Sequence, residues 1–327
     1  MDTKKLVISM MIGIFFISTI LSSGCSLWGE KEDETPSEPK YGEFYIEGTD
    51  GVVISFMRNR PPSELYKNVP FQIAVKLENR GEHTIRGINS LVKVFISGIY
   101  PFSYGFSEDE KSPEGEYLEG IRRFNNSVLP GGIAEVVFDG TGYNGYIKEG
   151  GRWEQPLKVS VCYPYETNVA SKVCLKDDIY KDTVGSTPCK ITGSKYVETS
   201  ASPIKVTKVY EEPIGTDTVA FKIDIENVGG RYPYIGEIDE CAGLDEKNQN
   251  EIILASMKCG DLGLKCTSGC ALDSGGLIKL YDNKAIIIIE GDISNANVPA
   301  AESEEMLTLR FYYNYYDDVS KTIAVLG

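Results

Sequence analysis

Histidine is almost missing from this sequence, because His83 is the single one in 327 residues. A lone histidine in a loop is more typical of solvated surface than of a general base. No G-x-S-x-G, H-E-x-x-H or phosphate-binding loop occurs either, which removes the commonest hydrolase and NTPase classes. The 48 acidic residues leave a carboxylate pair open, but none stands out. We therefore predict that the chain is not an enzyme and has no cofactor.

Basic residues are outnumbered by acidic ones, and the formal net charge is −15. Residues 1–24 carry Asp2, Lys4 and Lys5, a net +1, so their removal would make it −16. Such a chain repels nucleic acid and anionic lipid. We expect no nucleic-acid partner, and we expect membrane contact to come from an anchor.

The anchor is predicted at the N-terminus, where two lysines precede an uncharged run over 6–21 and then Ser22-Ser23-Gly24-Cys25. This is a secretory signal peptide, 1–24. The small residues before Cys25 resemble a lipobox, which implies lipidation of Cys25, although Leu21 lies four residues before the cysteine instead of three. The alternative is an uncleaved membrane anchor, for which the run is short of about 20 residues. Residues 25–42 are charged and proline-rich, as in a flexible tether outside the membrane.

An internal repeat predicts the architecture. Residues 71–81 return as 219–229, and both segments alternate apolar and polar side chains before Asn-x-Gly. The period of two indicates half-buried strands. The core sides are expected to be Phe71, Ile73, Val75 and Leu77 in one copy, and Val219, Phe221, Ile223 and Ile225 in the other.

A second repeat aligns 157–174 with 307–324, and we interpret each segment as a hairpin that turns at 167–169 or 317–319. The expected core sides are Leu157, Val159, Val161 and Tyr163 in the first, and Leu307, Leu309, Phe311 and Tyr313 in the second. The chain is therefore predicted to be all-β, with two tandem immunoglobulin-like antiparallel β-sandwich domains at 43–180 and 200–327 and a linker at 181–199.

At this point the sequence resembles a known family. The strand that ends in residues 77–81, followed by 128–138, is similar to the CARDB-type immunoglobulin-like repeats of prokaryotic surface proteins. Residues 48–56 with Pro61-Pro62, and residues 161–167, are similar to uncharacterised secreted proteins of archaea. The resemblance covers most of 45–327 and implies a fold and a surface location more firmly than an activity.

The eight cysteines of an exported chain are interpreted as disulfides first. With Cys25 set aside, the hairpin predicts a Cys162–Cys174 bond, with Cys162 pointing outward. In the second copy, Tyr312 and Ala324 replace that pair. Two further disulfides are expected among Cys241, Cys259, Cys266 and Cys270, whose spacing does not favour zinc. Cys189 is left as the free thiol.

Several polar features are candidates for ligands or partners. The acidic residues at 237–240 and 245–246 lack calcium-loop spacing, so a solvated charge run is favoured. Asn125 begins a glycosylation sequon. Tyr312 and Tyr316 are expected to point outward as contact residues. Packing of these two tyrosines over Ala324 is the alternative.

The leading functional hypothesis is a surface adhesion or envelope-scaffolding module that contacts an envelope protein or a glycan. The alternative is a solute- or glycan-binding lipoprotein with a cleft between the domains. A third class, an envelope hydrolase, would require converging carboxylates, one of them with a raised pKa.

Overall fold

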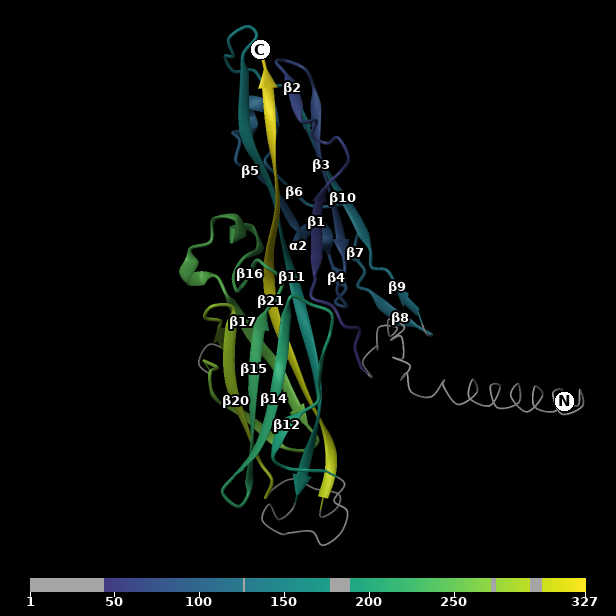
Figure 1. The fold of residues 1–327 in the computed structure, drawn as a ribbon, viewed down its shortest axis with the longest axis vertical. Helices are drawn as coiled ribbons and strands as arrows, with labels where there is room; N and C mark the ends of the chain where they lie inside the picture. The colour runs from purple at the N-terminus through teal and green to yellow at the C-terminus, as the bar shows by residue number, and fades with distance from the viewer. Residues whose placement is uncertain (1–43, 126, 177–188, 272–274, 295–301) are drawn as a thin grey trace, which may run out of the picture. The chain divides into compact units, whose positions relative to one another are not determined.

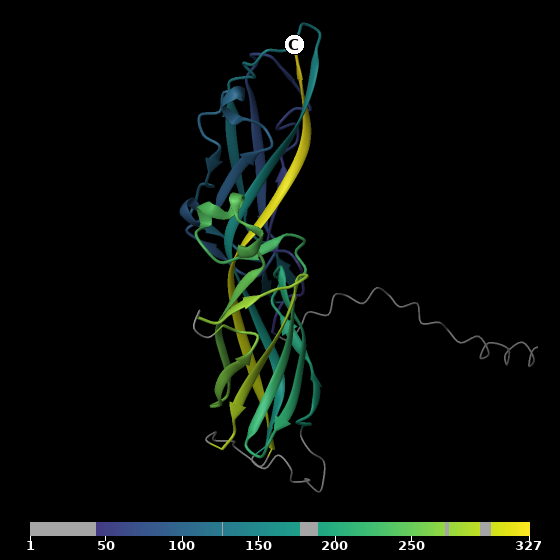
Figure 2. The same cartoon turned by 90° about the vertical axis from the view of Figure 1, so that its left-hand side faces the viewer.

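Two strands of 25 residues each organise the fold, β11 (Arg152–Lys176) and β21 (Glu302–Leu326). The computed structural model describes residues 44–125, 127–176, 189–271, 275–294 and 302–327. The two strands pair antiparallel along their whole length, with Pro164 opposite Asn314 at the centre. In both views they lie side by side, β11 in teal and β21 in yellow (Figures 1 and 2).

The two predicted hairpins are therefore wrong, because the chain does not reverse at 167–169 or at 317–319. Every second side chain stays buried beyond the predicted turn, at Tyr165, Thr167 and Val169. The strand therefore continues along the same core. Asn168 and Asp318 suit a turn, but they also fit an extended strand. The asparagines with a positive φ include Asn59 and Asn68, which lie in loops outside β11 and β21.

The other strands complete one central sheet and two outer sheets. The central sheet has the order β19-β17-β21-β11-β5-β6. In addition, β13 pairs with β11, and β2 and β16 pair with β21. The outer sheets have the orders β1-β3-β10 and β12-β14-β15-β20-β18. The central sheet adds β2 (Glu64–Tyr66), β5 (Lys93–Ser97), β6 (Glu110–Lys111), β13 (Val197–Thr199), β16 (Tyr232–Tyr234), β17 (Glu251–Cys259) and β19 (Leu277–Lys279). The outer strands are β1 (Val52–Phe56), β3 (Phe71–Asn79), β10 (Ile133–Gly140), β12 (Gly193–Lys195), β14 (Ile204–Ile214), β15 (Thr218–Asn227), β18 (Gly263–Ser268) and β20 (Lys284–Asp292).

Short elements fill the connections. Two small two-stranded sheets pair β4 with β7 and β8 with β9. Their strands are β4 (Ile85–Arg86), β7 (Tyr117–Leu118), β8 (Arg122–Phe124) and β9 (Ser127–Leu129), and the short helices are α2 (Ile88–Leu91), η1 (Pro101–Tyr104), η2 (Ile238–Gly243) and η3 (Glu246–Asn248). None of the helices in the described ranges is long and apolar enough to cross a membrane. Side chains of the central and outer sheets share one hydrophobic core. The prediction of all-β antiparallel sandwiches is confirmed.

The predicted core sides of the repeated strands are confirmed. Each strand buries alternate side chains because one face of its sheet packs against the facing sheet. The buried residues are Phe71, Ile73, Val75 and Leu77 of β3, Val219, Phe221, Ile223 and Ile225 of β15, Leu157, Val159, Val161 and Tyr163 of β11, and Leu307, Leu309, Phe311 and Tyr313 of β21.

The repeat is also visible in the hydrogen bonds of its asparagines. Asn79 at the end of β3 accepts at Oδ1 from the Tyr165 hydroxyl at 3.2 Å and from the Gly81 backbone N–H at 3.2 Å. Asn227 at the end of β15 does the same with the Tyr315 hydroxyl at 3.1 Å and the Gly229 N–H at 3.2 Å. The two copies thus have the same local structure, and each uses one tyrosine of a long strand.

The two copies are joined through their longest strands. Residues 41–327 form one compact unit. The first part of β11 pairs with β5, and its last part pairs with β13, which lies in the chain between β12 and β14 of the second outer sheet. Each half of the molecule therefore contains part of β11 and part of β21. The predicted domain boundaries at 43–180 and 200–327 stay predictions. We call the region around the Pro164–Asn314 pair the waist.

The disulfides differ from the predicted set. Cys162 is bonded to Cys241, Cys174 to Cys189, and Cys266 to Cys270. The Cys162–Cys174 prediction is wrong because both residues lie on one continuous strand, facing Tyr316 and Glu304 of β21 instead of each other. Cys189, predicted to be free, is bonded. Cys259, predicted to be bonded, is the buried free thiol of the described residues. Three disulfides indicate an oxidising compartment.

A non-reducing peptide map tests this connectivity. We expect two linked peptide pairs, one peptide with an internal Cys266–Cys270 bond, and a Cys259 thiol that is alkylated only after unfolding, because the native side chain is buried and burial raises its pKa to about 12. The Cys162–Cys241 bond joins residues 79 apart, so replacing both by Ala should lower the free energy of unfolding by about 4 kcal/mol. A Cys162–Cys174 peptide, or native alkylation of Cys259, would contradict the structure.

Candidate contact surface

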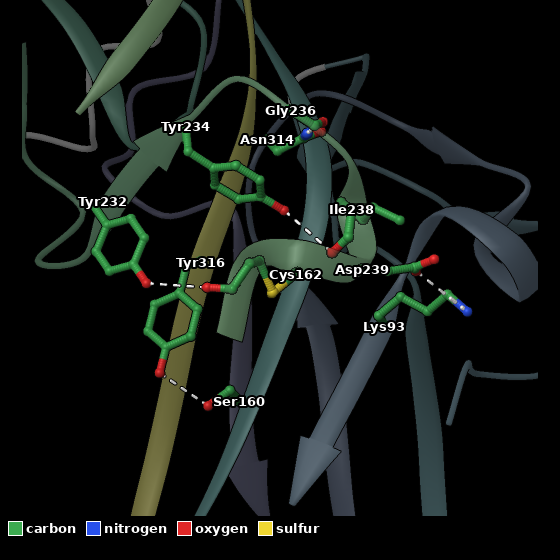
Figure 3. The surroundings of a disulfide bond; sticks show 11 residues. Lys93, Ser160, Cys162, Tyr232, Tyr234, Gly236, Ile238, Asp239, Asn314 and Tyr316 are labelled. Carbon is green, nitrogen blue, oxygen red and sulfur yellow. Dashed lines mark hydrogen bonds and ion pairs between the residues drawn. A yellow bond between two sulfur atoms is a disulfide. The ribbon is translucent and has the colours of Figure 1, made fainter. Parts of the chain in front are cut away.

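At the waist β16 pairs with β21 in the central sheet, and η2, which follows it in the chain, covers the outer face of that sheet. The Cys162–Cys241 disulfide fastens η2 to β11. Tyr232 donates from its hydroxyl to the Cys241 carbonyl at 3.3 Å, and Asn314 donates from Nδ2 to the Gly236 carbonyl at 2.9 Å (Figure 3). Asp239 lies 3.6 Å from the Lys93 ammonium. The cover is thus fixed to both long strands and to β5.

Tyr316, predicted to point outward as a contact residue, lies beneath this cover. Only 6% of the residue is exposed. Its ring stacks on Tyr232 with centroids 4.7 Å apart, and its hydroxyl hydrogen-bonds Ser160 Oγ at 3.0 Å (Figure 3). The predicted side of the strand was right, since Tyr316 and Cys162 do point away from the main core. The expectation of exposure was wrong because 72 or more residues separate Tyr316 from the segment that covers it. Tyr312 remains 39% exposed.

His83 also differs from its prediction. Its side chain is 25% exposed, its Nδ1 lies 3.9 Å from Glu166 Oε2, and its ring packs against Tyr165 at 5.2 Å. Burial lowers the pKa of His83, although the neighbouring Glu166 opposes that shift. His83 is therefore a packed side chain beside the waist. No group of three or more metal-type ligands converges among the side chains that the structure describes.

The folded part of the chain begins at the waist. The backbone N–H groups of Phe44 and Tyr45 donate to Glu198 Oε2 at 2.8 and 3.2 Å. The N–H of Ile46 donates to Glu82 Oε2 at 3.0 Å, and the same oxygen accepts from Ala201 at 2.8 Å. Two carboxylates, Glu82 of the first copy and Glu198 of β13, therefore hold the chain where it enters the structure. Cys25 and the signal peptide lie outside the described residues.

One end of the first half carries several exposed aromatic side chains. They lie near Arg152, where β11 begins, and Leu326, where β21 ends, about 40 Å from Pro164 at the usual rise per strand residue. In Figure 1, β2 and the C-terminus mark this end. We call these residues the aromatic end: Tyr66 (58% exposed), Tyr100 (68%), Phe102 (53%), Tyr146 (87%) and Trp153 (42%).

The aromatic end was not among the sites predicted from the sequence. Local composition could have indicated it. Residues 97–107 and 140–147 contain aromatic, glycine and small polar residues and no charged side chain. Asn125, the predicted glycosylation site, is exposed in the turn between β8 and β9.

Comparisons with known proteins do not identify a family. No protein-family model and no curated protein matches the chain. Among solved structures it is similar to Escherichia coli alpha-2-macroglobulin activated by porcine elastase, with 9% sequence identity and a TM-score of 0.19. The match covers 84% of this chain and 32% of that one, so the chain spans about a third of that protein's length. Similarity at this level carries no argument about function.

Replacing Tyr316 tests its buried position. Tyr316→Ala should lower the free energy of unfolding by about 3 kcal/mol, because it removes a buried, stacked ring. Tyr316→Phe keeps the ring and loses the hydrogen bond to Ser160, so about 1 kcal/mol is expected. Urea unfolding measures both variants, and Tyr312→Ala is the partly exposed control. A Tyr316→Ala protein as stable as its parent would show that the cover does not bury this ring.

Proposed function

We propose that the protein is a cell-surface lipoprotein, anchored outside the membrane through Cys25, and that it acts as an adhesion or envelope-scaffolding module without enzymatic activity. The observation that supports this best is the aromatic end. It gathers five exposed aromatic side chains at one end of the molecule, and grouped exposed aromatic residues are typical of interaction sites. Exposed Tyr and Trp side chains are effective in contacts because a large rigid ring buries area at little cost in conformational entropy.

The position of the aromatic end supports display away from a membrane. The chain enters the folded part at the waist, held by Glu82 and Glu198. The aromatic end is about 40 Å from the waist along the long strands. A tether of some 15 residues would add up to about 50 Å when extended. The CARDB-type resemblance is consistent with this role and remains part of the proposal.

The alternative is a solute-binding lipoprotein, and one groove at the waist favours it. This groove has a volume of about 360 Å³ and is lined by Tyr45, Glu47, Tyr196 and Lys205 among others. Burial lowers the pKa of Lys205 to about 8, against the influence of Glu82 and Glu47. We rank this function second because β11 and β21 pass unbroken through the waist, so the halves have no hinge with which to close on a solute.

The anchor is tested by Cys25→Ser. We expect the variant to lose its acyl group, to remain as an uncleaved precursor, and to leave the membrane fraction if the lipid is its main attachment. Mass spectrometry of the intact protein and membrane fractionation measure these outcomes. If the variant is processed and partitions with membranes as its parent does, the lipid assignment is wrong.

The contact role is tested by a double substitution, Tyr100→Ala with Phe102→Ala. Both side chains are more than half exposed, so the melting temperature should change little, whereas binding to isolated envelopes of the source organism should fall at least tenfold. Tyr281→Ala is the matched control, because Tyr281 is 75% exposed but lies in the second half. Equal envelope binding by the double variant and its parent would remove the aromatic end as the contact surface.

A further inference from the structure

Two loops of the aromatic end, residues 97–107 and 140–147, are joined by backbone hydrogen bonds. The Asn144 N–H donates to the Ser103 carbonyl at 2.9 Å, and the Gly142 N–H donates to the Tyr104 carbonyl at 3.2 Å. The buried ring of Tyr143 lies 5.0 Å from that of Tyr104. The loop that follows β10 is therefore bonded to η1, which carries Phe102. Any ligand would meet a surface that is already ordered, which reduces the entropy lost on binding.

Trp153 and Tyr66 are attached to the same framework. The Trp153 ring lies 5.5 Å from Tyr143, at an interplanar angle of 56°. The Asn68 N–H donates to the Tyr143 carbonyl at 3.1 Å, which fixes the segment that follows Tyr66. Buried Tyr143 thus links the two loops to Trp153 and to the segment that follows Tyr66.

The two loops that carry Tyr100, Phe102 and Tyr146 contain no charged side chain, whereas charged residues flank Tyr66 and Trp153. Residues 97–107 and 140–147 contain no Asp, Glu, Lys, Arg or His, although the chain has 48 acidic and 33 basic side chains. Arg152, the neighbour of Trp153, is engaged by Glu64 at 2.6 Å and Glu154 at 3.2 Å. A strongly charged ligand would therefore find few opposite charges here. A basic protein would be attracted to the acidic body instead.

We propose that the aromatic end binds a neutral carbohydrate. The faces of Tyr, Phe and Trp rings are electron-rich and attract the weakly positive C–H groups on the flat face of a sugar ring. Tyrosine hydroxyls and the small polar residues of the loops can hydrogen-bond the sugar hydroxyls. A neutral glycan also matches the absence of charge in the two loops and is not repelled by a net charge of −15. This inference rests on the proposed adhesive function and names the chemical class of its ligand.

The test uses the full-length protein on an array of neutral oligosaccharides and polysaccharides, with acidic polysaccharides and phosphatidylcholine vesicles as separate probes. We expect binding to at least one neutral glycan, unchanged by 1 M NaCl, because no ion pair contributes. The Tyr100→Ala, Phe102→Ala double variant should bind that glycan at least tenfold more weakly, and Trp153→Ala should also weaken binding. Tyr281→Ala should bind as the parent does.

Three outcomes would overturn the inference: no binding to any neutral glycan, binding to vesicles alone, or neutral-glycan binding that the aromatic substitutions leave unchanged. Unfolding curves for each variant separate a lost contact from a lost fold. If the double variant loses envelope binding while the parent binds no neutral glycan, the adhesive function stands and the ligand class is wrong. If envelope binding is unaffected by the double variant, the contact assignment itself fails.

Discussion

The structure depends on the continuous pairing of β11 with β21. Because the pairing is antiparallel and is centred on Pro164 and Asn314, this pair is the one in which a residue of the first copy lies opposite its equivalent in the second copy. Each half of the molecule is then built on strands from both copies. A break in either strand would disrupt the central sheet, against which the outer sheets of both halves pack. The two halves are therefore expected to unfold together.

Buried tyrosines of β11 and β21 pack at the waist and connect the two long strands to the outer sheets. Tyr163 and Tyr315 face each other across the strand pair, as do Tyr165 and Tyr313. Their hydroxyls reach hydrogen-bond partners in the outer layers, including Asn79, Asn227 and the backbone of Val52. A buried tyrosine combines a large apolar surface with one polar group that needs a partner. The waist is thus well packed, and its hydrogen bonds specify how each outer sheet sits on the central one.

Function on this scaffold is expected at its loops. The sheets pack against each other, and the outer face at the waist is covered by η2, which the Cys162–Cys241 bond holds in place. The loops around Tyr143 at the end of the first half are ordered by backbone hydrogen bonds and leave aromatic rings exposed. Loops carried on a rigid scaffold are the usual location of binding residues. This combination is consistent with the contact role that we propose.

The sequence by itself determined the strands and the faces they bury. The period of two in residues 71–79 and 219–227 is a local property, and the same is true of the Asn-x-Gly turns that end them. The same alternation in residues 157–174 and 307–324 correctly assigned Cys162 and Tyr316 to the face opposite the main core. Only the tertiary structure decided that 152–176 continues as one strand, because Asn168 suits a turn or an extended strand equally well. The partners of Cys162 and Tyr316 were decided in the same way, since Cys241 and Tyr232 are 79 and 84 residues away in the chain. A pairing over such a distance depends on how the sheets assemble, which no local pattern encodes.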